Sequence, residues 1–265
     1  MPRPLPSHRP PLRPRQKGVA LFVVIVFVML SMLLALWASR TSLFNEMVVG
    51  NDADYQRAFE AAQALLQDAE LDIRGEYADG NPCIANCRNQ LPPNTPEKIP
   101  LDTQDVTPLL AHLDQQTTKC SRGLCTKRTG RQDFWNYTSA TDPAPTDLKP
   151  GEVKLEDMTK TGIGVRYGEY TGAARGDETA AKRANPILQW TATTPDNRGG
   201  WYWIELLPYD ESSKNSGLIV GGSNNLLRLN LKPNIAYRIT AVAYGLKPNT
   251  MAVLQQTYVR QIRKD

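Results

Sequence analysis

The sequence predicts an α+β protein in which one long N-terminal helix packs against a C-terminal antiparallel sheet. Three observations lead to this prediction. Residues Val19–Arg74 include no proline and a single glycine, Gly50, so a helix can continue through the whole segment. Apolar residues with a period of two appear only from Ile163 onward. Between these parts lies a proline-rich region, 75–150, which contains all four cysteines.

The first part of the long helix is apolar enough to cross a membrane. Residues Val19–Ala38 carry no charge, and at ~1.5 Å per residue they extend ~30 Å, the thickness of the hydrocarbon core of a bilayer. No acid appears before Glu46, and positive flanks of a span remain in the cytoplasm, so we expect the ~225 residues after it to lie outside. The preceding cations are Arg3, Arg9, Arg13, Arg15 and Lys17.

Beyond Arg40 the helix becomes amphipathic, which indicates that it packs against another surface. The apolar positions recur at steps of three and four residues: Tyr55, Ala58, Phe59, Ala62, Leu65, Leu66, Ala69 and Ile73. The polar positions are assigned to the opposite, solvent-facing side: Asp52, Gln56, Arg57, Glu60, Gln63, Gln67, Asp68 and Glu70. The apolar stripe would cover one face of the C-terminal sheet.

Lys17 and Gly18, followed by the apolar run from Val19, resemble the cleavage site of a type IV prepilin. In that family an inner-membrane peptidase cuts after the glycine and methylates the new N-terminus. The resemblance therefore implies Gly18 and Val19 as the cleavage site and Val19 as the methylated residue. Most pilins carry glutamate at the fifth mature position, where this chain has Val23. Minor pilins of the PilX type and the K-type pseudopilin of type II secretion also lack it.

Two further segments resemble PilX. Residues 45–52 (NEMVVGND) and 59–66 (FEAAQALL) are similar to its patterns E-x-M-x-x-G-N and A-F-x-A-A-E-x-A-L, with Gln63 where an acid is usual. The final hairpin, 237–241 and 253–258, is similar to the end of PilX proteins. The resemblance implies the pilin ladle, a long helix joined to a sheet domain, and the function of a minor pilin required for type IV pilus assembly.

The resemblance also implies an organisation and a location. Residues 1–18 would be the leader, 19–39 the transmembrane half of the helix, 40–75 its amphipathic half and 76–265 a periplasmic globular domain. The implied location is the inner membrane and then the pilus tip. The implied partners are other minor pilins, the major pilin, a large PilY-type tip adhesin and the prepilin peptidase. The alternatives are a K-type pseudopilin or a membrane-anchored periplasmic interaction module.

Composition argues against some other classes. The net charge is +4, but the five cations of residues 1–18 have no acid beside them there, which leaves −1 for the rest, so a nucleic-acid surface is disfavoured. A cleaved secretory signal and a plain signal anchor are the competing interpretations of the N-terminus. The apolar run is too long for a signal core, and Leu36-Trp37-Ala38 is a poor small-x-small cleavage site.

The proline-rich region is expected to be mostly loop, with one short helix at Val106–Gln116. Thr107 would be the N-cap of this helix and Pro108 its first residue. An even number of cysteines in an oxidising compartment indicates disulfides, and three connectivities are open. A zinc site competes, but no C-x2-C pair is present. The candidates are Cys83, Cys87, Cys120 and Cys125. Similarity of 120–125 to the C-x-x-G-x-C loop of PilX proteins favours local closure.

The C-terminal part reads as successive short strands with tight turns, typical of an antiparallel sheet. The expected strands are Ile163–Tyr170, Ile187–Thr193, Trp201–Leu207, Leu226–Leu231, Ile235–Tyr244 and Met251–Arg260.

Catalytic patterns are sparse, so no enzyme activity, cofactor or metal is predicted. Apart from His8 in the leader, His112 is the sole imidazole. The glycines of 162–168 resemble a dinucleotide-binding loop but lack a following helix, so turns are expected there. Trp201-Tyr202-Trp203 is expected to be core on at least one side, with a contact platform as the alternative. Arg175-Gly176-Asp177 matches the integrin tripeptide, which we attribute to chance.

Overall fold

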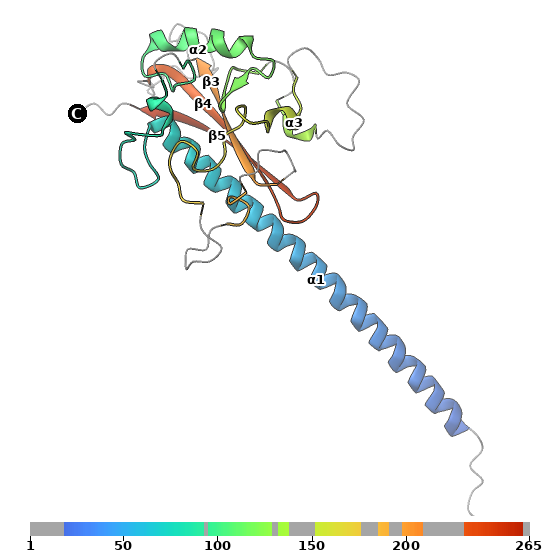
Figure 1. The fold of residues 1–265 in the computed structure, drawn as a ribbon. Coiled ribbons are helices and arrows are strands. Elements are labelled where there is room, and N and C mark those ends of the chain that lie inside the picture. Colours follow the sequence, from blue (N-terminus) through green and yellow to red (C-terminus); the bar gives the residue numbers. More distant parts are fainter. Residues whose placement is uncertain are drawn as a thin grey trace, which may run out of the picture. The chain divides into compact units, whose positions relative to one another are not determined.

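The computed structural model describes residues 19–92, 95–128, 132–137, 152–175, 185–190, 198–208 and 231–261. These divide into two compact units, Met1–Gly50 and Asn51–Asp265, which are treated separately below. Helix α1, Val19–Arg74, is continuous as the sequence predicts (Figure 1). It ends at Gly75, whose φ of 70° permits the two hydrogen bonds that close the last turn, Gly75 N–H to Asp72 O and Glu76 N–H to Leu71 O.

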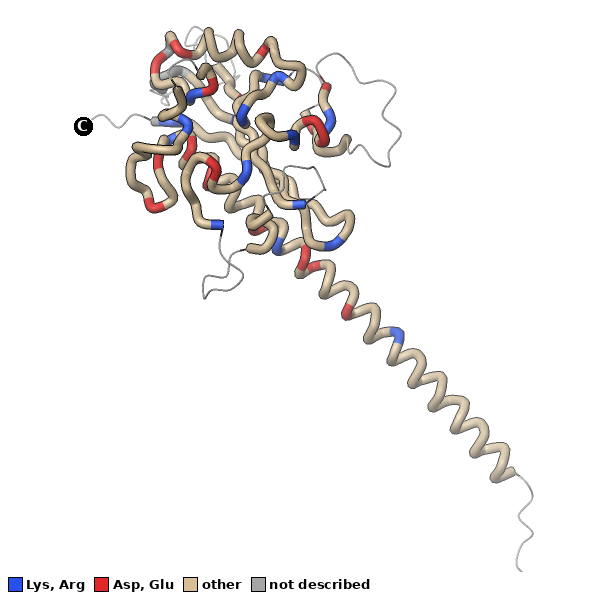
Figure 2. The backbone as a smooth tube through the Cα atoms, viewed as in Figure 1, with Lys and Arg blue, Asp and Glu red and all other residues tan. Residues whose placement is uncertain are grey.

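In the first unit, α1 exposes a continuous apolar surface. Figure 2 shows the N-terminal part of the helix without a charged residue. Its hydroxyl at Ser31 is satisfied within the helix, because Oγ lies 2.9 Å from the carbonyl oxygens of both Phe27 and Val28. Among the described residues, α1 is the helix long and apolar enough to cross a membrane. This fits a single-pass anchor, since a spanning helix must satisfy its polar groups internally.

The second unit is built around a five-stranded sheet in the order β1-β2-β3-β4-β5. Its pairs are antiparallel, except that β2 and β3 are parallel with Leu124 opposite Ile204. The sequence did not predict this parallel pair. The α+β class and the mostly antiparallel sheet are confirmed. The strands are β1 (Cys120–Ser121), β2 (Leu124–Cys125), β3 (Gly200–Pro208), β4 (Leu231–Tyr244) and β5 (Met251–Gln261).

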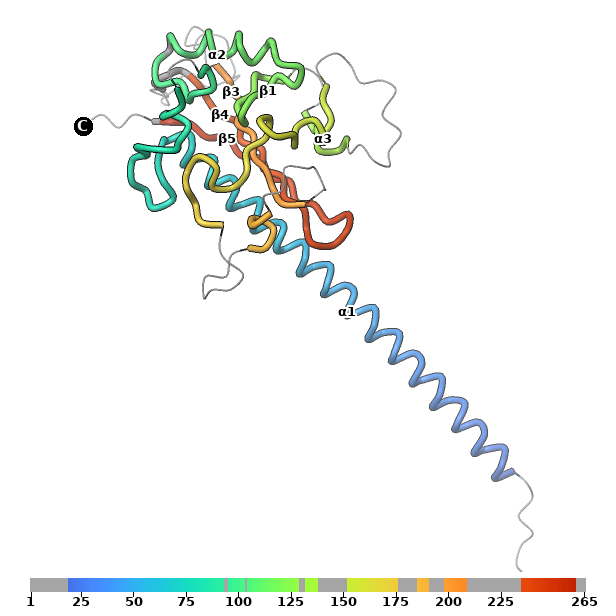
Figure 3. Tube along the Cα trace, in the orientation of Figure 1, coloured from blue at the N-terminus to red at the C-terminus, as the bar shows by residue number. Residues whose placement is uncertain are grey.

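Alternate residues of β3 enter two different cores. Tyr202 packs in the core that contains the α1 residues Ala58 and Leu65, together with Ile204, Leu206, Tyr237, Ile239 and Ala241. Trp201 and Trp203 pack in a second core with Phe134, Leu155 and Met158, which lie on the short helices η2 (Phe134–Asn136) and α3 (Leu155–Met158). Figure 3 shows where helix α2 (Thr103–Gln115), strand β1 and helix α3 lie along the chain.

The aromatic cluster of β3 is therefore buried on both sides. Trp201, Tyr202 and Trp203 are each at most 2% exposed. Trp203 Nε1 donates to the Met158 carbonyl oxygen at 3.1 Å, and its ring meets that of Phe134 edge to face at 5.0 Å. The contact platform considered from the sequence is wrong, because no face of this cluster is left for a ligand.

The short helix of the proline-rich region begins earlier than expected. Helix α2 is Thr103–Gln115, so the expected start at Thr107 and Pro108 is wrong, and Pro108 lies inside the helix. The N-cap is Asp102, whose N–H donates to Asp105 Oδ2 at 3.3 Å. This carboxylate satisfies an N–H group at the start of the helix, which favours initiation at Asp102. A further short helix, η1, is Arg88–Gln90.

Three expected strands, 201–207, 235–244 and 251–260, are confirmed by β3, β4 and β5. The strand expected at Ile163–Tyr170 is wrong: it forms turns with one isolated bridge, Val165 to Tyr202. Gly168 explains part of this error, since its φ of 71° belongs to a turn and a Cβ there would meet the Ala173 carbonyl oxygen. Residues 187–189 are also turns, and 191–193 and 226–230 lie outside the described residues.

The four cysteines form two local disulfides, Cys83–Cys87 and Cys120–Cys125. This is the connectivity that the PilX resemblance favours, out of the three that were open. The second bridge joins β1 to β2, and both of its cysteines are fully buried in the core that contains Trp203. In the first bridge Cys87 is buried, but Cys83 is partly exposed.

The two bridges should contribute unequally to stability. Closing a loop of about five residues restricts the unfolded chain by ~2 kcal/mol, so each Cys→Ser pair should lower the free energy of unfolding by at least that amount. The Cys120→Ser/Cys125→Ser variant should lose ~1 kcal/mol more, because it also places two hydroxyls in an apolar core. Urea unfolding of the full chain in detergent measures both values. A smaller loss for the buried bridge than for Cys83→Ser/Cys87→Ser would contradict this expectation.

Candidate functional site

The imidazole of His112 lies beside a carboxylate, Glu97, which also binds the hydroxyl of Ser121. His112 Nε2 lies 3.1 Å from Glu97 Oε1, and Ser121 Oγ donates to the same oxygen at 2.8 Å. Burial raises the pKa of Glu97, but the hydrogen bond from Ser121 and further bonds outweigh it, so the pKa is lowered and the carboxylate is ionised at neutral pH. Ser121 is thus bound to the carboxylate and not to the imidazole, so the three side chains do not have the Ser–His–acid order of a catalytic triad.

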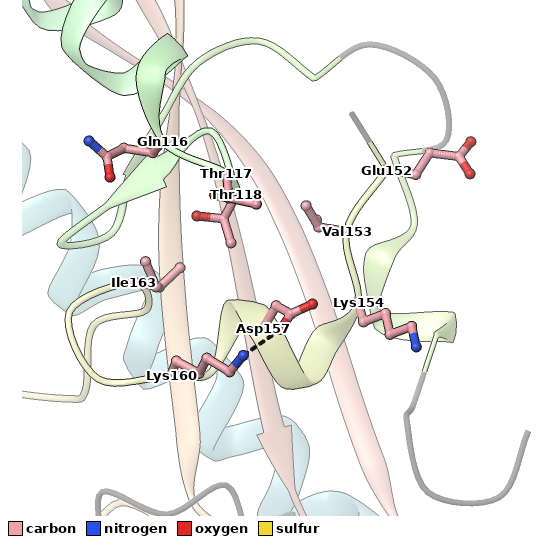
Figure 4. Close-up of a pocket in the computed structure, with 9 residues that line it drawn as sticks. All are labelled: Gln116, Thr117, Thr118, Glu152, Val153, Lys154, Asp157, Lys160 and Ile163. Atoms are coloured by element: carbon pink, nitrogen blue, oxygen red, sulfur yellow. Dashed lines mark hydrogen bonds and ion pairs between the residues drawn. The ribbon is translucent and has the colours of Figure 1, made fainter. Parts of the chain in front are cut away.

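A pocket of about 420 Å³ opens beside α3 (Figure 4). Its lining combines the apolar side chains of Val153 and Ile163 with charged groups of both signs, including an ion pair of 2.6 Å between Lys160 Nζ and Asp157 Oδ1. No aromatic, histidine or cysteine side chain lines it. No group of metal-ligating side chains occurs among the described residues either.

The most organised polar feature is on α1, where three aspartates face the interior. Asp54, Asp68 and Asp72 are each at most 3% exposed. The sequence assigned Asp68 to the solvent side, and this was wrong. Each carboxylate accepts hydrogen bonds from a different segment of the second unit, so the three act together as acceptors that fix these segments to the helix. A buried carboxylate is tolerated only with such partners.

Asp72 forms a buried ion pair with Arg88, which directly follows the Cys83–Cys87 loop. Arg88 Nη2 lies 2.7 Å from Asp72 Oδ2, and Nε donates at 3.0 Å, with both side chains 1% exposed. Arg88 Nη1 donates to the Arg122 carbonyl oxygen at 2.8 Å. The Tyr202 hydroxyl donates to Asp72 Oδ2 at 3.0 Å. Burial acts to lower the pKa of Arg88, but the Asp72 carboxylate more than compensates, so the pKa is raised and Arg88 stays charged.

Asp68 holds the turn at 166–173. Its Oδ2 accepts the Gly168 N–H at 2.7 Å, and its Oδ1 accepts the Thr171 hydroxyl. Burial raises the pKa of Asp68 to about 6, even though both hydrogen bonds act to lower it, and the neighbouring Asp72 charge raises it further. Asp68 therefore titrates near pH 6.

Asp54 holds the β4–β5 hairpin. Its Oδ1 accepts the Leu246 N–H at 2.9 Å and its Oδ2 accepts the Lys247 N–H at 3.0 Å. Burial acts to raise the pKa of Asp54, but the two backbone N–H groups outweigh it, so the pKa is lowered. Lys247 Nζ also donates to Asn51 Oδ1 at 3.0 Å, which adds a second link between hairpin and helix.

The first unit offers a different kind of surface, an uncovered apolar helix. Val23, at the position where most pilins have an acid, is 43% exposed. Past the charge at Arg40, the apolar side chains Leu43, Phe44, Met47 and Val48 are each more than half exposed. Apolar area of this extent is stable only against lipid or another protein. The expected cleavage residue Gly18 lies outside the described residues, and Val19 is the first residue of α1.

Two family models match the chain. The model described as PilX N-terminal matches residues 17–67, which include the Lys17-Gly18 pair and most of α1. The model described as Type IV pilus assembly protein PilX C-term matches residues 121–260, which begin in β1 and end in β5. The chain belongs to the PilX family. No curated protein and no solved structure matches it.

PilX membership establishes the general function. Two matched regions account for the anchor helix and for most of the sheet, so this PilX protein is a type IV pilus minor pilin that interacts with other pilus components. The family is structural and not catalytic.

Sequence reasoning missed the residues that connect α1 to the loops, namely Asp54, Asp72, Arg88 and Tyr202. A signal was present for the acids. Asp54, Asp68 and Asp72 are separated by 14 and 4 residues, which places all three on one side of a helix, in phase with the apolar stripe. Their partners Arg88 and Tyr202 could not be found in this way, because only the tertiary fold brings them together.

Asp68 gives the PilX protein a defined pH dependence. Its pKa in the folded state, about 6, lies above the ordinary 3.8, so folding favours the protonated form. The stabilisation is complete below pH ~3.8 and is lost as pH rises through ~6, a change of about 3 kcal/mol. Asp68→Asn should remove that change, since the amide oxygen can accept the Gly168 N–H and the Thr171 hydroxyl can accept from the amide. The variant should therefore gain stability relative to wild type between pH 4 and pH 7.

Urea unfolding of both full chains in detergent at pH 4, 5, 6 and 7 measures this difference. Asp52→Asn is the matched control, because Asp52 is an exposed acid on the same helix. A difference between Asp68→Asn and wild type that stays constant with pH would contradict the assignment.

Proposed function

We propose that this PilX protein helps to start pilus assembly and remains at or near the tip of the pilus, together with other minor pilins and a large PilY-type adhesin. The observation that carries the proposal is Val23. It stands at the fifth position after the expected cleavage site, in a helix whose sequence matches the PilX N-terminal family. Most pilins have glutamate there.

The physical argument concerns a carboxylate in lipid. An acid in the hydrocarbon core costs several kcal/mol unless it meets a cation, and in ordinary pilins that cation is the N-terminal amine of the subunit ahead. A subunit with Val23 has no acid to neutralise and loses nothing when no subunit precedes it. It can therefore be the first in the filament. It also gains no electrostatic attraction toward a subunit above it.

Recruitment of this subunit into the filament must then depend on apolar packing of its helix and on contacts of the second unit. Leu21, Val24 and Val28 are each more than half exposed on α1, so they are free to pack against neighbouring helices in the membrane. Contacts from the domain that holds the sheet would supply specificity. The proposed orientation, with residues 1–18 in the cytoplasm and the sheet domain in the periplasm, rests on the five cations before the span. The two PilX matches favour this function over a K-type pseudopilin.

The proposal includes processing by a prepilin peptidase. We expect mass spectrometry of the mature protein from membranes and sheared pili to find Val19 as an N-methylated N-terminus. Gly18→Leu should leave residues 1–17 attached, because a bulky residue does not fit a site that cuts after glycine. Gly50→Ala is the control. It changes a glycine within the long helix, away from the expected cleavage site, and should leave processing intact. Intact residues 1–17 on protein recovered from sheared pili would contradict processing.

Two kinds of experiment test placement at the tip: the location of the protein along the pilus, and the effect of a charge introduced at Val23. Deletion of the chain should abolish or strongly reduce surface pili without changing the level of the major subunit. Immunogold labelling should be confined to pilus ends, at a copy number far below that of the major pilin. Val23→Glu should not increase the number of pili, and Val23→Leu should leave it unchanged. Uniform labelling along the shaft, at a stoichiometry near that of the major pilin, would refute the placement.

A further inference from the structure

The Cys83–Cys87 loop exposes an apolar tip. Ile84 is 77% exposed, more than Leu101 at 53% or Leu246 at 59% in the same unit. Pro82 and Ala85 beside it are exposed as well. Single exposed aliphatic residues are common and need no explanation. This loop differs because its two apolar residues, Ile84 and Ala85, are both exposed, with exposed Pro82 just before it, and because its shape is fixed.

Several bonds fix the loop around Tyr77. The disulfide closes it, and the Tyr77 hydroxyl occupies its interior, where it accepts the N–H groups of Ala85 at 2.9 Å and Ile84 at 3.3 Å. The same hydroxyl donates to the Ala85 carbonyl oxygen at 2.9 Å. At the start of the loop, Cys83 N–H donates to the Gly75 carbonyl oxygen at 2.8 Å. The backbone of the tip therefore has few accessible conformations.

The base of the loop is attached to the core. Arg88, which follows Cys87, is held by Asp72 on α1 with both side chains 1% exposed. Ala78 N–H donates to the Thr171 carbonyl oxygen at 3.1 Å. The tip residues, by contrast, bury little surface of their own. Holding an exposed segment in one conformation costs conformational entropy during folding. A loop that is already ordered then loses less conformational entropy when it binds a partner.

We propose that the Cys83–Cys87 loop is a docking element that inserts Ile84 into an apolar cleft on the periplasmic domain of a different pilus subunit. A lipid surface does not fit the loop: residues 77–87 contain no Lys or Arg and one acid, Asp79. A second copy of the chain does not fit well either, because the pocket beside α3 carries charged side chains of both signs next to its apolar residues, Val153 and Ile163 (Figure 4). An aliphatic tip matches a neutral, apolar cleft.

The identity of the partner as a pilus subunit rests on the proposed function, and the test separates the two. The photo-crosslinking residue p-benzoylphenylalanine is placed at Ala85 in the full-length chain in piliated cells, and the adduct is identified by mass spectrometry. Leu101, an exposed apolar residue outside the loop, is the control position for the probe. With the probe at Ala85, Ile84→Asp should reduce the adduct about tenfold or more, because a buried charge replaces an apolar anchor, whereas Ile84→Val should retain it.

The expected adduct joins this chain to a different protein that has a pilin-type N-terminal helix. No adduct above the Leu101 level, an adduct with lipid or with a second copy, or an adduct unchanged by Ile84→Asp would overturn the inference. The Ile84→Asp chain must keep both disulfides and the thermal midpoint of wild type; if it does not, Ile84→Ser replaces it. If deletion of the chain abolishes pili and Ile84→Asp does not reduce them, the docking element is wrong and the proposed function stands.

Discussion

The second unit depends on one buried ion pair, Asp72 with Arg88. Asp72 is on the last turn of α1, and through Arg88 and Tyr202 it connects that helix to the Cys83–Cys87 loop, to the β1–β2 turn at Arg122 and to β3. A buried ion pair contributes little net stability compared with an apolar pair of the same volume. Its effect is on specificity, because any arrangement that separates the partners leaves an uncompensated charge in the core.

The aspartates at 54 and 68 extend the same principle along the helix. Each replaces water at backbone N–H groups of a loop, Gly168 in one case and Leu246 with Lys247 in the other. Irregular loops contain N–H groups that no strand or helix satisfies, and buried acceptors solve this problem. A pilin helix therefore serves two environments. Its N-terminal part has no polar group that lipid would exclude, and its C-terminal part carries the acceptors that the domain requires.

Much of this architecture was predictable from sequence, and the rest was not for identifiable reasons. The spacing of apolar residues along one element can be read from the local sequence. Helix α1 and the strands at 201–207, 235–244 and 251–260 were therefore predicted correctly. The strand expected at 163–170 failed because Val165 makes only one bridge and Gly168 turns the chain. The parallel pairing of β2 with β3 joins segments far apart in sequence. Asp68 was placed in solvent because charge alone was considered, without the phase it shares with Asp54 and Asp72.

The central claim is that the pair of Asp72 and Arg88 fixes the loops to α1, and a double-mutant cycle in the full chain tests it most directly. Asp72→Asn and Arg88→Met should each lower the free energy of unfolding by ~3–5 kcal/mol, and the double variant should lose much less than the sum. The exposed pair Arg74 and Glu76, with side chains 39% and 32% exposed, is the control and should change by less than ~1 kcal/mol. Additive losses for Asp72 and Arg88, or losses no larger than those of the control pair, would contradict the account.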